Sequence, residues 1–203
     1  MTVKFAGDWK NNGEMIADVA RLHFPADPFV LDVTYGSGRW WNTYRPDNLY
    51  ASDLHPKEEW VEEADFRNLP WYDSQFDVVA FDPPYKLNGR STGAGVAASD
   101  EGYGVGEYVG WKDKMQTIHE GVVEGMRVAR RGGLLLIKCQ DQVCSGKMRW
   151  QTRDFADTAE KWGGRLKDSF DFYGTGGRAQ PAGRRQKHAY GRPSTLLVVV
   201  KER

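Results

Sequence analysis

Four consecutive residues, Asp82-Pro83-Pro84-Tyr85, suit one chemical task, the holding of a flat amine. The exocyclic nitrogen of a nucleic-acid base is a poor nucleophile, because its lone pair is delocalised into the ring. A carboxylate and a backbone carbonyl that each accept one of its hydrogens favour a pyramidal nitrogen with a directed lone pair. Pro84 restricts Pro83 to extended geometry, which aims the Pro83 carbonyl, and Tyr85 offers a face on which a flipped base can stack. The tetrapeptide therefore predicts a catalytic site, and a strand that merely ends in a proline turn is the alternative.

An apolar run that ends in Asp32 is followed by a second group of candidate residues, Gly36-Ser37-Gly38. Glycines have no side chain, so the backbone of this turn can approach a ligand closely while the following amides face outward. Trp41 stands where the dinucleotide-binding fingerprint would have its third glycine. The turn therefore indicates a ligand site but disfavours a nicotinamide-dependent dehydrogenase.

Three further residues follow apolar or acidic segments in positions suited to a nucleoside. Asp53 can accept two hydrogen bonds from a ribose diol, and a helix N-cap is the alternative role for this carboxylate. Asp65 could offer its carboxylate to an adenine amino group while the neighbouring Phe66 amide meets the ring. An ordinary surface turn is the alternative for this pair.

Short apolar runs are predicted to position these residues. The runs 29–33, 48–52 and 76–81 have the length and composition of buried parallel strands, and 62–66 is a further candidate edge. The prolines after 76–81 lack amide hydrogens and must end that strand. Because ligands bind at the carboxyl ends of parallel strands, the candidate motifs should meet at one rim of the sheet.

The rest of the chain continues this alternation of strands and helices. Residues 115–129 and 152–162 have helical spacing. Strands are predicted at 134–138, 166–173 and 195–201. We therefore expect one α/β domain over residues 1–203, with a mostly parallel sheet covered by helices on both faces.

Two long connections on the predicted rim are candidates for substrate contacts. Residues 86–110 are rich in glycine, serine and alanine, which predicts a mobile loop. Residues 174–193 contain no acidic side chain and predict a basic loop that contacts phosphates. A solvated hairpin connection is the alternative. The candidate nucleic-acid contacts of this loop are Arg178, Arg184, Arg185, Lys187 and Arg192.

The bulk composition excludes several classes of protein. Lys and Arg balance Asp and Glu at 28 each, and no apolar run approaches the roughly 20 residues that span a bilayer. Cys139 and Cys144 have no partners at metal-ligand spacing, so no metal site is expected. With no secretory signal and no disulfide framework, we expect a cytoplasmic protein with no membrane partner.

Four tryptophans, Trp40, Trp41, Trp71 and Trp150, could suggest a base-stacking platform. Aromatic side chains with large buried areas more often pack in the core or at the rim of a site. We therefore expect packing roles for all four and assign none of them to the site.

Two of the motifs resemble those of a known family. Val30 to Gly38 (VLDVTYGSG) resembles the cofactor motif, and Phe81 to Tyr85 (FDPPY) resembles the catalytic motif, of the N6-adenine/N4-cytosine DNA methyltransferases of small phage or bacterial type. The resemblance implies a Rossmann-like class I fold with a seven-stranded sheet and an antiparallel C-terminal strand. It also implies S-adenosylmethionine as the cofactor, and the cytoplasm of a bacterial or phage-infected cell as the location.

The same resemblance assigns roles to individual residues. Asp82, Pro83 and Tyr85 would hold the target base beside Pro84. Asp32, Gly36 and Gly38 would hold the methionine part of the cofactor, Asp53 its ribose, and Asp65 and Phe66 its adenine. The remaining candidate cofactor contacts are Thr34, Tyr35 and Leu54.

Two departures from the family pattern affect what can be expected. Val33-Thr34 replaces the usual Pro-Phe after the cofactor-motif aspartate, which alters cofactor packing. No segment after Tyr85 is long enough for a separate target-recognition domain, so specificity must come from the two loops or from a partner protein.

Methylation of adenine N6 in DNA is the function that the resemblance favours. Cytosine N4, an RNA base or a protein glutamine side chain are the alternatives within the enzyme class, since each presents a planar amine. In a different class, the chain would be a nucleic-acid-binding module that keeps the fold without turnover.

Overall fold

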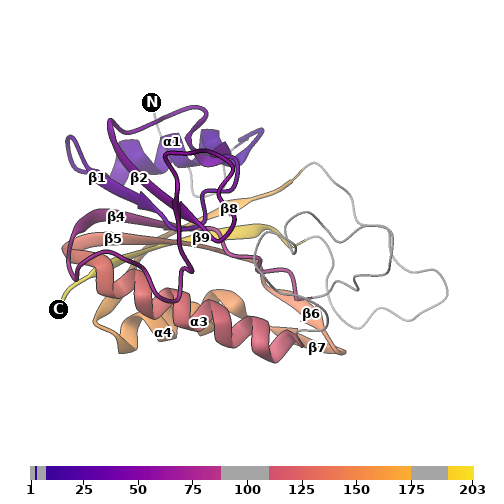
Figure 1. Cartoon of the computed structure of the whole chain (residues 1–203). Coiled ribbons are helices and arrows are strands. Elements are labelled where there is room, and N and C mark those ends of the chain that lie inside the picture. The colour runs from indigo at the N-terminus through magenta and orange to yellow at the C-terminus, as the bar shows by residue number, and fades with distance from the viewer. Residues whose placement is uncertain (1–2, 4–7, 88–109, 175–191) are drawn as a thin grey trace.

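The computed structural model describes residues 3, 8–87, 110–174 and 192–203 (Figure 1). Most of the expected mobile loop 86–110 lies outside the described residues. Most of the basic loop 174–193 does so as well, including Arg178, Arg184, Arg185 and Lys187.

In the described part of the chain, seven strands form one sheet in the order β3-β2-β1-β4-β5-β9-β8. The neighbours from β3 to β5 pair in parallel, whereas β9 runs antiparallel to both β5 and β8. The expected mostly parallel sheet with an antiparallel C-terminal strand is confirmed. The bounds are β1 (Phe29–Asp32), β2 (Asn48–Asp53), β3 (Glu62–Glu63), β4 (Phe76–Phe81), β5 (Ala129–Cys139), β8 (Gly164–Phe172) and β9 (Ser194–Lys201).

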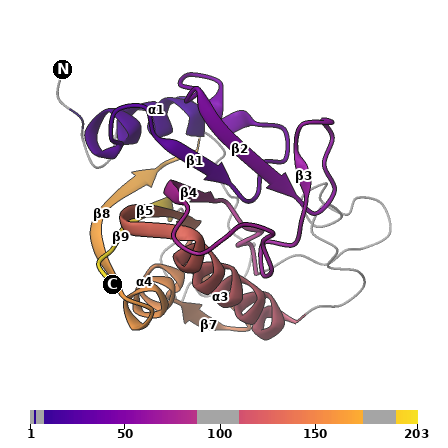
Figure 2. The same ribbon diagram turned by 60° about the vertical axis from the view of Figure 1, so that its left-hand side comes forward.

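Helices cover both faces of this sheet, as expected. Helix α1 (Asn12–His23) and the short 3-10 helix η1 (Arg39–Trp41) lie on one face, while α3 (Trp111–Val128) and α4 (Gln151–Lys161) lie on the other (Figures 1 and 2). Each face has its own cluster of buried apolar side chains, and every residue of β4 between them is buried. This burial on two sides explains why β4 is a continuous apolar run rather than an alternating one.

Helix α1 is not among the elements expected from the sequence, although its signals are present. Asn11 caps it by accepting a hydrogen bond from the Glu14 amide at 3.0 Å. Met15, Ile16 and Val19 form its buried stripe. The glycine at position 13 interrupts the helical composition but fits, because this turn packs closely against the Arg39 carbonyl.

A β-hairpin of β6 (Gln142–Cys144) and β7 (Lys147–Arg149) is also absent from the sequence-based elements. Ser145 and Gly146 join its strands, and both have a positive φ. Two such residues form the turn that matches the twist of a tight hairpin. The strand after α3 also differs from expectation, because β5 begins directly at Ala129 instead of following a glycine linker.

The order of the strands creates a junction that positions the candidate residues. From β1 the chain moves to β2 on one side, and it returns to β4 on the other side of β1. The direction of winding therefore reverses between β1 and β4, and in open α/β sheets this switch point is where ligands bind. Asp32 ends β1 and Asp82 directly follows β4.

None of the described helices is long and apolar enough to cross a membrane.

Close contact between α3 and the sheet generates a prediction at Gly121. A Cβ atom there would lie 2.5 Å from Phe81 Cζ and 2.7 Å from Phe66 Cδ2, two rings that already pack edge to face. We expect Gly121→Ala to lower the free energy of unfolding, because overpacking by about 1–3 kcal/mol exceeds the gain of up to about 1 kcal/mol in helix propensity. Urea unfolding followed by circular dichroism measures this.

Gly125→Ala, one turn further along the same helix, is the matched control. Its Cβ would meet Leu135 Cδ1 at 2.8 Å, which is the end of a flexible side chain that can move aside. We expect it to leave stability unchanged or raised. Stabilisation by Gly121→Ala as well would show that α3 does not pack tightly against Phe81.

Candidate active site

The two sequence motifs meet at the β1–β4 junction through Thr34. The amide of Asp82 donates to Thr34 Oγ1 at 2.7 Å, and the amide of Thr34 donates to Asp32 Oδ1 at 2.9 Å. Thr34 itself is buried. A single threonine thus connects the candidate cofactor turn with the candidate catalytic segment, at the position where the family pattern has a different residue.

Asp32 is a buried carboxylate that neutral donors surround. The Trp41 indole Nε1 donates to Asp32 Oδ2 at 2.8 Å, and the Thr34 amide occupies the other oxygen. Burial raises the pKa of Asp32 to about 7, although both hydrogen bonds oppose the rise, and the nearby Asp82 and Asp53 carboxylates add to it. The hydrogen-bond partners of Asp32 are therefore neutral groups, and above about pH 7 the carboxylate is mostly ionised.

Asp82 has a similar environment with one important difference. The Trp40 indole Nε1 donates to Asp82 Oδ2 at 2.9 Å, and burial raises the pKa of this carboxyl to about 6. Lys138 opposes that rise and is itself fully buried, with Nζ 3.2 Å from Asn12 Oδ1. Desolvation lowers the Lys138 pKa to about 8. With the lower pKa of the two, the Asp82 carboxylate is the more fully ionised at neutral pH.

The backbone of the proline segment is held by two buried amide side chains. Gln142 of β6 and Gln151 of α4 each donate from Nε2 to the Tyr85 carbonyl oxygen at 2.8 Å. Gln142 also accepts from the Leu87 amide at 2.9 Å through Oε1. The Tyr85 amide donates to the Pro83 carbonyl at 2.7 Å, which leaves that oxygen a second lone pair. The segment is therefore fixed at both ends before any substrate arrives.

The glycine turn is attached to the end of β2 by Asp53. The Gly36 amide donates to Asp53 Oδ2 at 2.8 Å, and the His55 amide donates to Oδ1 at 3.0 Å. Gly36 has a φ of +57°, and among the described residues a Cβ there would meet just one atom, the Thr34 carbonyl oxygen at 3.9 Å. The turn thus leaves open space beside its backbone, as a ligand site requires. Leu54 follows Asp53 and is half-buried.

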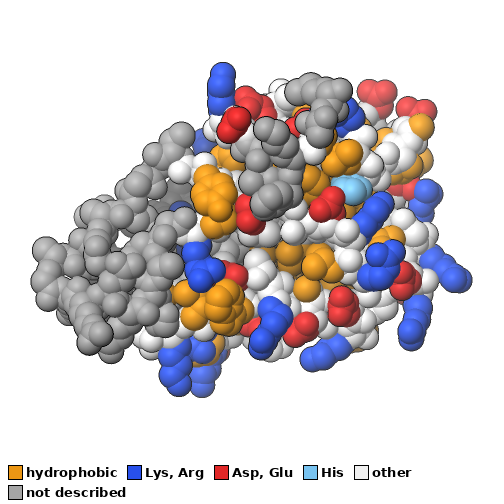
Figure 3. Space-filling view, turned by 180° about the vertical axis from the view of Figure 1, so that it is seen from behind, with side chains coloured by type: hydrophobic (Ala, Val, Ile, Leu, Met, Phe, Trp, Pro, Cys, Tyr) orange, Lys and Arg blue, Asp and Glu red, His pale blue; other side chains and the backbone are white. Residues whose placement is uncertain are grey.

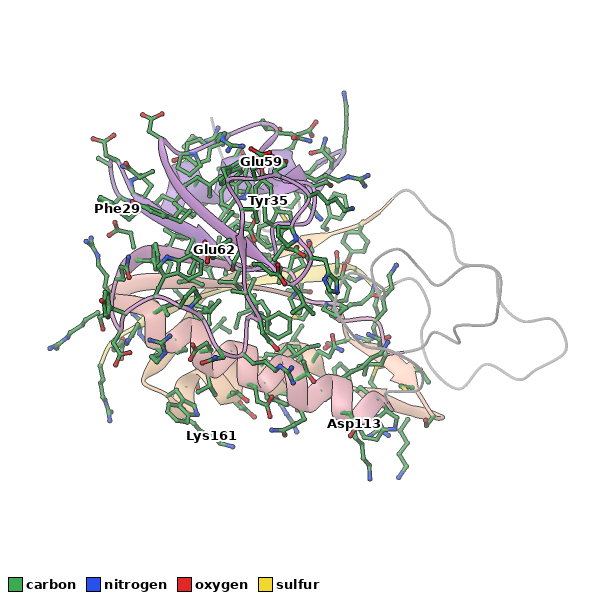
Figure 4. All side chains as sticks on the ribbon, viewed as in Figure 1. Phe29, Tyr35, Glu59, Glu62, Asp113 and Lys161 are labelled. Carbon is green, nitrogen blue, oxygen red and sulfur yellow. The ribbon has the colours of Figure 1, made fainter. Side chains whose placement is uncertain are left out.

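Tyr35 and Gly38 fit together on the α1 side of the sheet. A Cβ on Gly38 would lie 2.4 Å from the Tyr35 hydroxyl, so this glycine makes room for the ring. The ring packs edge-on against Trp60 with centroids 4.9 Å apart, and Arg45 donates to the hydroxyl at 3.2 Å. Figure 4 shows Tyr35 in this layer near Glu59. The buried Tyr35 side chain therefore packs against the glycine turn at Gly38.

The candidate adenine contacts lie beyond β3. The Asp65 carboxylate accepts three hydrogen bonds from the Arg67 guanidinium, including one of 2.9 Å between Nε and Oδ2. This pairing lowers the Asp65 pKa. The Phe66 side chain is buried with its centroid 5.0 Å from that of Phe81. In this state Asp65 is engaged with Arg67, so contact with an adenine amino group stays a prediction.

Sequence reasoning missed the functional contacts of Trp40 and Trp41. Both rings are buried, as a packing role requires, but their indole N–H groups reach the two central carboxylates. The sequence feature that could have indicated these contacts is the position of both tryptophans directly after the glycine turn, where the structure forms η1. Trp71 packs against the core as expected, whereas Trp150 is 43% exposed and carries the Arg192 guanidinium over its ring at 4.8 Å.

Among the described residues, no group of three or more His, Cys, Asp or Glu side chains is arranged to hold a metal ion. Cys139 is buried, and burial raises its pKa far above the usual range of a thiol.

Comparison with solved structures identifies the architecture. A putative methyltransferase from Bacillus halodurans superposes with a TM-score of 0.59 at 15% identity, covering 93% of this chain and 99% of the other. The 1,6-didemethyltoxoflavin-N1-methyltransferase of Burkholderia thailandensis, with S-adenosylhomocysteine bound, has a TM-score of 0.56 at 12% identity and coverages of 95% and 79%. The [4+2]-cyclase SpnF has a TM-score of 0.57 at 16% identity and coverages of 93% and 80%.

No protein-family model matches the sequence, and no curated protein matches it. At identities of 12–16% the likeness concerns the fold. The chain has the Rossmann-like fold of the class I methyltransferases.

Proposed function

We propose that this protein transfers a methyl group from S-adenosylmethionine to an exocyclic amino group of a nucleic-acid base, with adenine N6 in DNA as the substrate. The observation that carries the proposal is the position of Asp82-Pro83-Pro84-Tyr85 at the switch point, joined through Thr34 to the glycine turn and Asp32. A carboxylate and a peptide carbonyl suited to an amine thus lie beside a glycine turn suited to a nucleoside cofactor.

The residues at the end of β1 and β2 fit such a cofactor. Asp32 is a buried carboxylate with neutral partners, which suits the ammonium of a methionine moiety. Gly36 leaves open space beside its backbone, and Asp53 has acceptor capacity beyond its two amide hydrogen bonds for a ribose diol. When bound, the cofactor supplies a methyl group activated by a sulfonium.

The chain's own groups then act on the amine. The Asp82 carboxylate and the Pro83 carbonyl each accept one amine hydrogen, which directs the lone pair at the methyl carbon. The nitrogen–carbon bond forms as the carbon–sulfur bond breaks, and the nitrogen acquires a positive charge. With its pKa raised to about 6, Asp82 can take the surplus proton and release it to water. Tyr85 provides the surface on which the base stacks.

The substrate is the part of the proposal that most needs a direct assay. SpnF has the same fold and is a cyclase, so the fold by itself does not dictate methyl transfer. The assay measures transfer of a radiolabelled methyl group to unmethylated DNA, with RNA and protein as parallel acceptors, followed by nucleoside analysis. Labelled N6-methyladenine in DNA supports the proposal. Label as N4-methylcytosine or in RNA changes the substrate, and cofactor binding without any transfer favours a nucleic-acid-binding module.

Asp82→Ala should abolish transfer while leaving the affinity for S-adenosylhomocysteine within a few-fold, because Asp82 is assigned to the amine and not to the cofactor. Transfer is measured with the labelled methyl group and affinity by calorimetry. Asp157→Ala, on the exposed side of α4, is the control and should keep full activity. Near-normal turnover of Asp82→Ala would remove this residue from the mechanism.

Cofactor affinity should depend on pH through Asp32. Its folded pKa is about 7, so it is mostly protonated below that pH and must lose the proton to hold an ammonium group. Affinity for S-adenosylhomocysteine should therefore rise by up to about tenfold per pH unit as the pH approaches 7 from below, and level off above it. Calorimetry between pH 5.5 and 8 measures this.

Asp32→Asn should bind more weakly and lose this pH dependence. Asp82→Asn, which leaves Asp32 intact, should keep it. An unchanged pH profile in Asp32→Asn would show that another group controls cofactor binding.

The two adjacent tryptophans should separate the two halves of the site. Loss of a hydrogen bond to a charged group costs about 1.5–3 kcal/mol, which is roughly a tenfold to hundredfold effect. Trp40→Phe should lower the kcat of transfer with little change in cofactor affinity, because its indole holds Asp82. Trp41→Phe should instead weaken cofactor binding through Asp32. Equal effects of both variants on both measurements would contradict this division.

A further inference from the structure

Two arginines on the surface beside the candidate active site are stacked on tryptophan rings. The Arg149 guanidinium lies 3.6 Å from the centroid of the Trp111 ring, and the Arg192 guanidinium lies 4.8 Å from that of Trp150. Arg149 and Trp150 are consecutive, at the end of β7 and the start of α4. We call these four residues the stacked-arginine surface.

Stacking holds each guanidinium plane without neutralising its charge. Among the described residues, neither the buried Nε of Arg149 nor that of Arg192 has a hydrogen-bond partner, and no carboxylate forms an ion pair with either residue. A buried donor without an acceptor costs about 1–3 kcal/mol. Both arginines therefore keep their positive charge and at least one donor that no described residue uses.

The neighbouring charges favour an anionic acceptor. Lys112 and Lys147 are exposed beside the two stacked pairs. The nearby carboxylates are engaged elsewhere, since Asp113 accepts from the Gly110 amide and Asp141 accepts from the Thr152 amide and hydroxyl. Figure 3 shows Lys and Arg side chains beside apolar ones on the end of the molecule that carries β6 and β7.

This surface is attached to the proline segment by direct hydrogen bonds. Gln142 of the same hairpin donates to the Tyr85 carbonyl, and Gln140 donates from Nε2 to the Arg192 carbonyl at 2.8 Å. A polymer bound across the stacked arginines would therefore be held at a fixed position relative to Tyr85. Such positioning suits a substrate whose base must leave a stack to reach the site.

We propose that the stacked-arginine surface binds the phosphate backbone of the nucleic acid that carries the target base, an inference that rests on the proposed function. Arginine offers planar pairs of donors that match phosphate oxygens, and a guanidinium already stacked on a ring loses little conformational entropy when it binds. Arg192 is the one expected basic-loop contact that the structure describes, and the surface adds Arg149, which lies outside that loop.

Fluorescence anisotropy with a labelled, adenine-containing DNA duplex at several salt concentrations tests this proposal. The double variant Arg149→Gln/Arg192→Gln should bind about tenfold or more weakly near 0.1 M salt. Its slope of log affinity against log salt should be smaller in magnitude by about two, because each lost phosphate contact removes about 0.9. Arg131→Gln is the matched control, since Arg131 is exposed near the start of β5, at the end of that strand away from Cys139 and the β6–β7 hairpin.

The Arg149→Lys/Arg192→Lys variant separates phosphate binding from a structural role. Lysine keeps the charge, so this variant should retain the salt slope of the unaltered protein. Unaltered affinity for S-adenosylhomocysteine in both double variants verifies the fold. If the unaltered protein binds DNA and the glutamine variant has the same affinity and slope, the inference is overturned and the proposed function stands. If the unaltered protein binds no DNA but transfers methyl groups to another acceptor, both the DNA substrate and the inference fail.

Discussion

Two carboxylates placed at one strand junction are the constraint on which the rest of this structure depends. Asp32 and Asp82 follow neighbouring parallel strands, and burial raises the pKa of both. Each accepts a hydrogen bond from an indole N–H, and Thr34 contacts both residues. Because neutral donors stabilise a carboxylate without cancelling its charge, these contacts fit the proposed binding of an ammonium group by Asp32 and of an amine by Asp82.

Several other elements contribute contacts to this junction. The Lys138 ammonium, buried on β5, offsets part of the negative charge at Asp82 and is in turn held by Asn12 of α1. Helix α1 thus does more than cover one face of the sheet, since it contacts a cation that lowers the Asp82 pKa. Gln142 and Gln151 hold the other side of the segment through the Tyr85 carbonyl. A site in which the backbone is fixed in advance loses little entropy when a substrate is aligned.

The fold and the site make different contributions to the functional conclusion. A methyltransferase and a cyclase both superpose on this chain, so the sheet order defines where a ligand binds rather than what happens to it. The proposed reaction depends instead on the chemical character of the groups at that rim. An acid beside a proline-constrained carbonyl is suited to an amine, and the hydrogen bonds from Trp40 and Thr34 keep the acid in position.

The α/β class, most strands, two of the helices and the two motifs that form the junction could be predicted from the sequence. These features are local: apolar runs, glycine turns and proline stops are encoded within a few neighbouring residues. Tertiary structure alone decided the contacts of Trp40, Trp41, Lys138, Gln142 and Gln151 with those motifs. Each of these side chains could equally have been ordinary core or surface packing, because a hydrogen bond between distant residues depends on which strands become neighbours and which groups burial leaves without water.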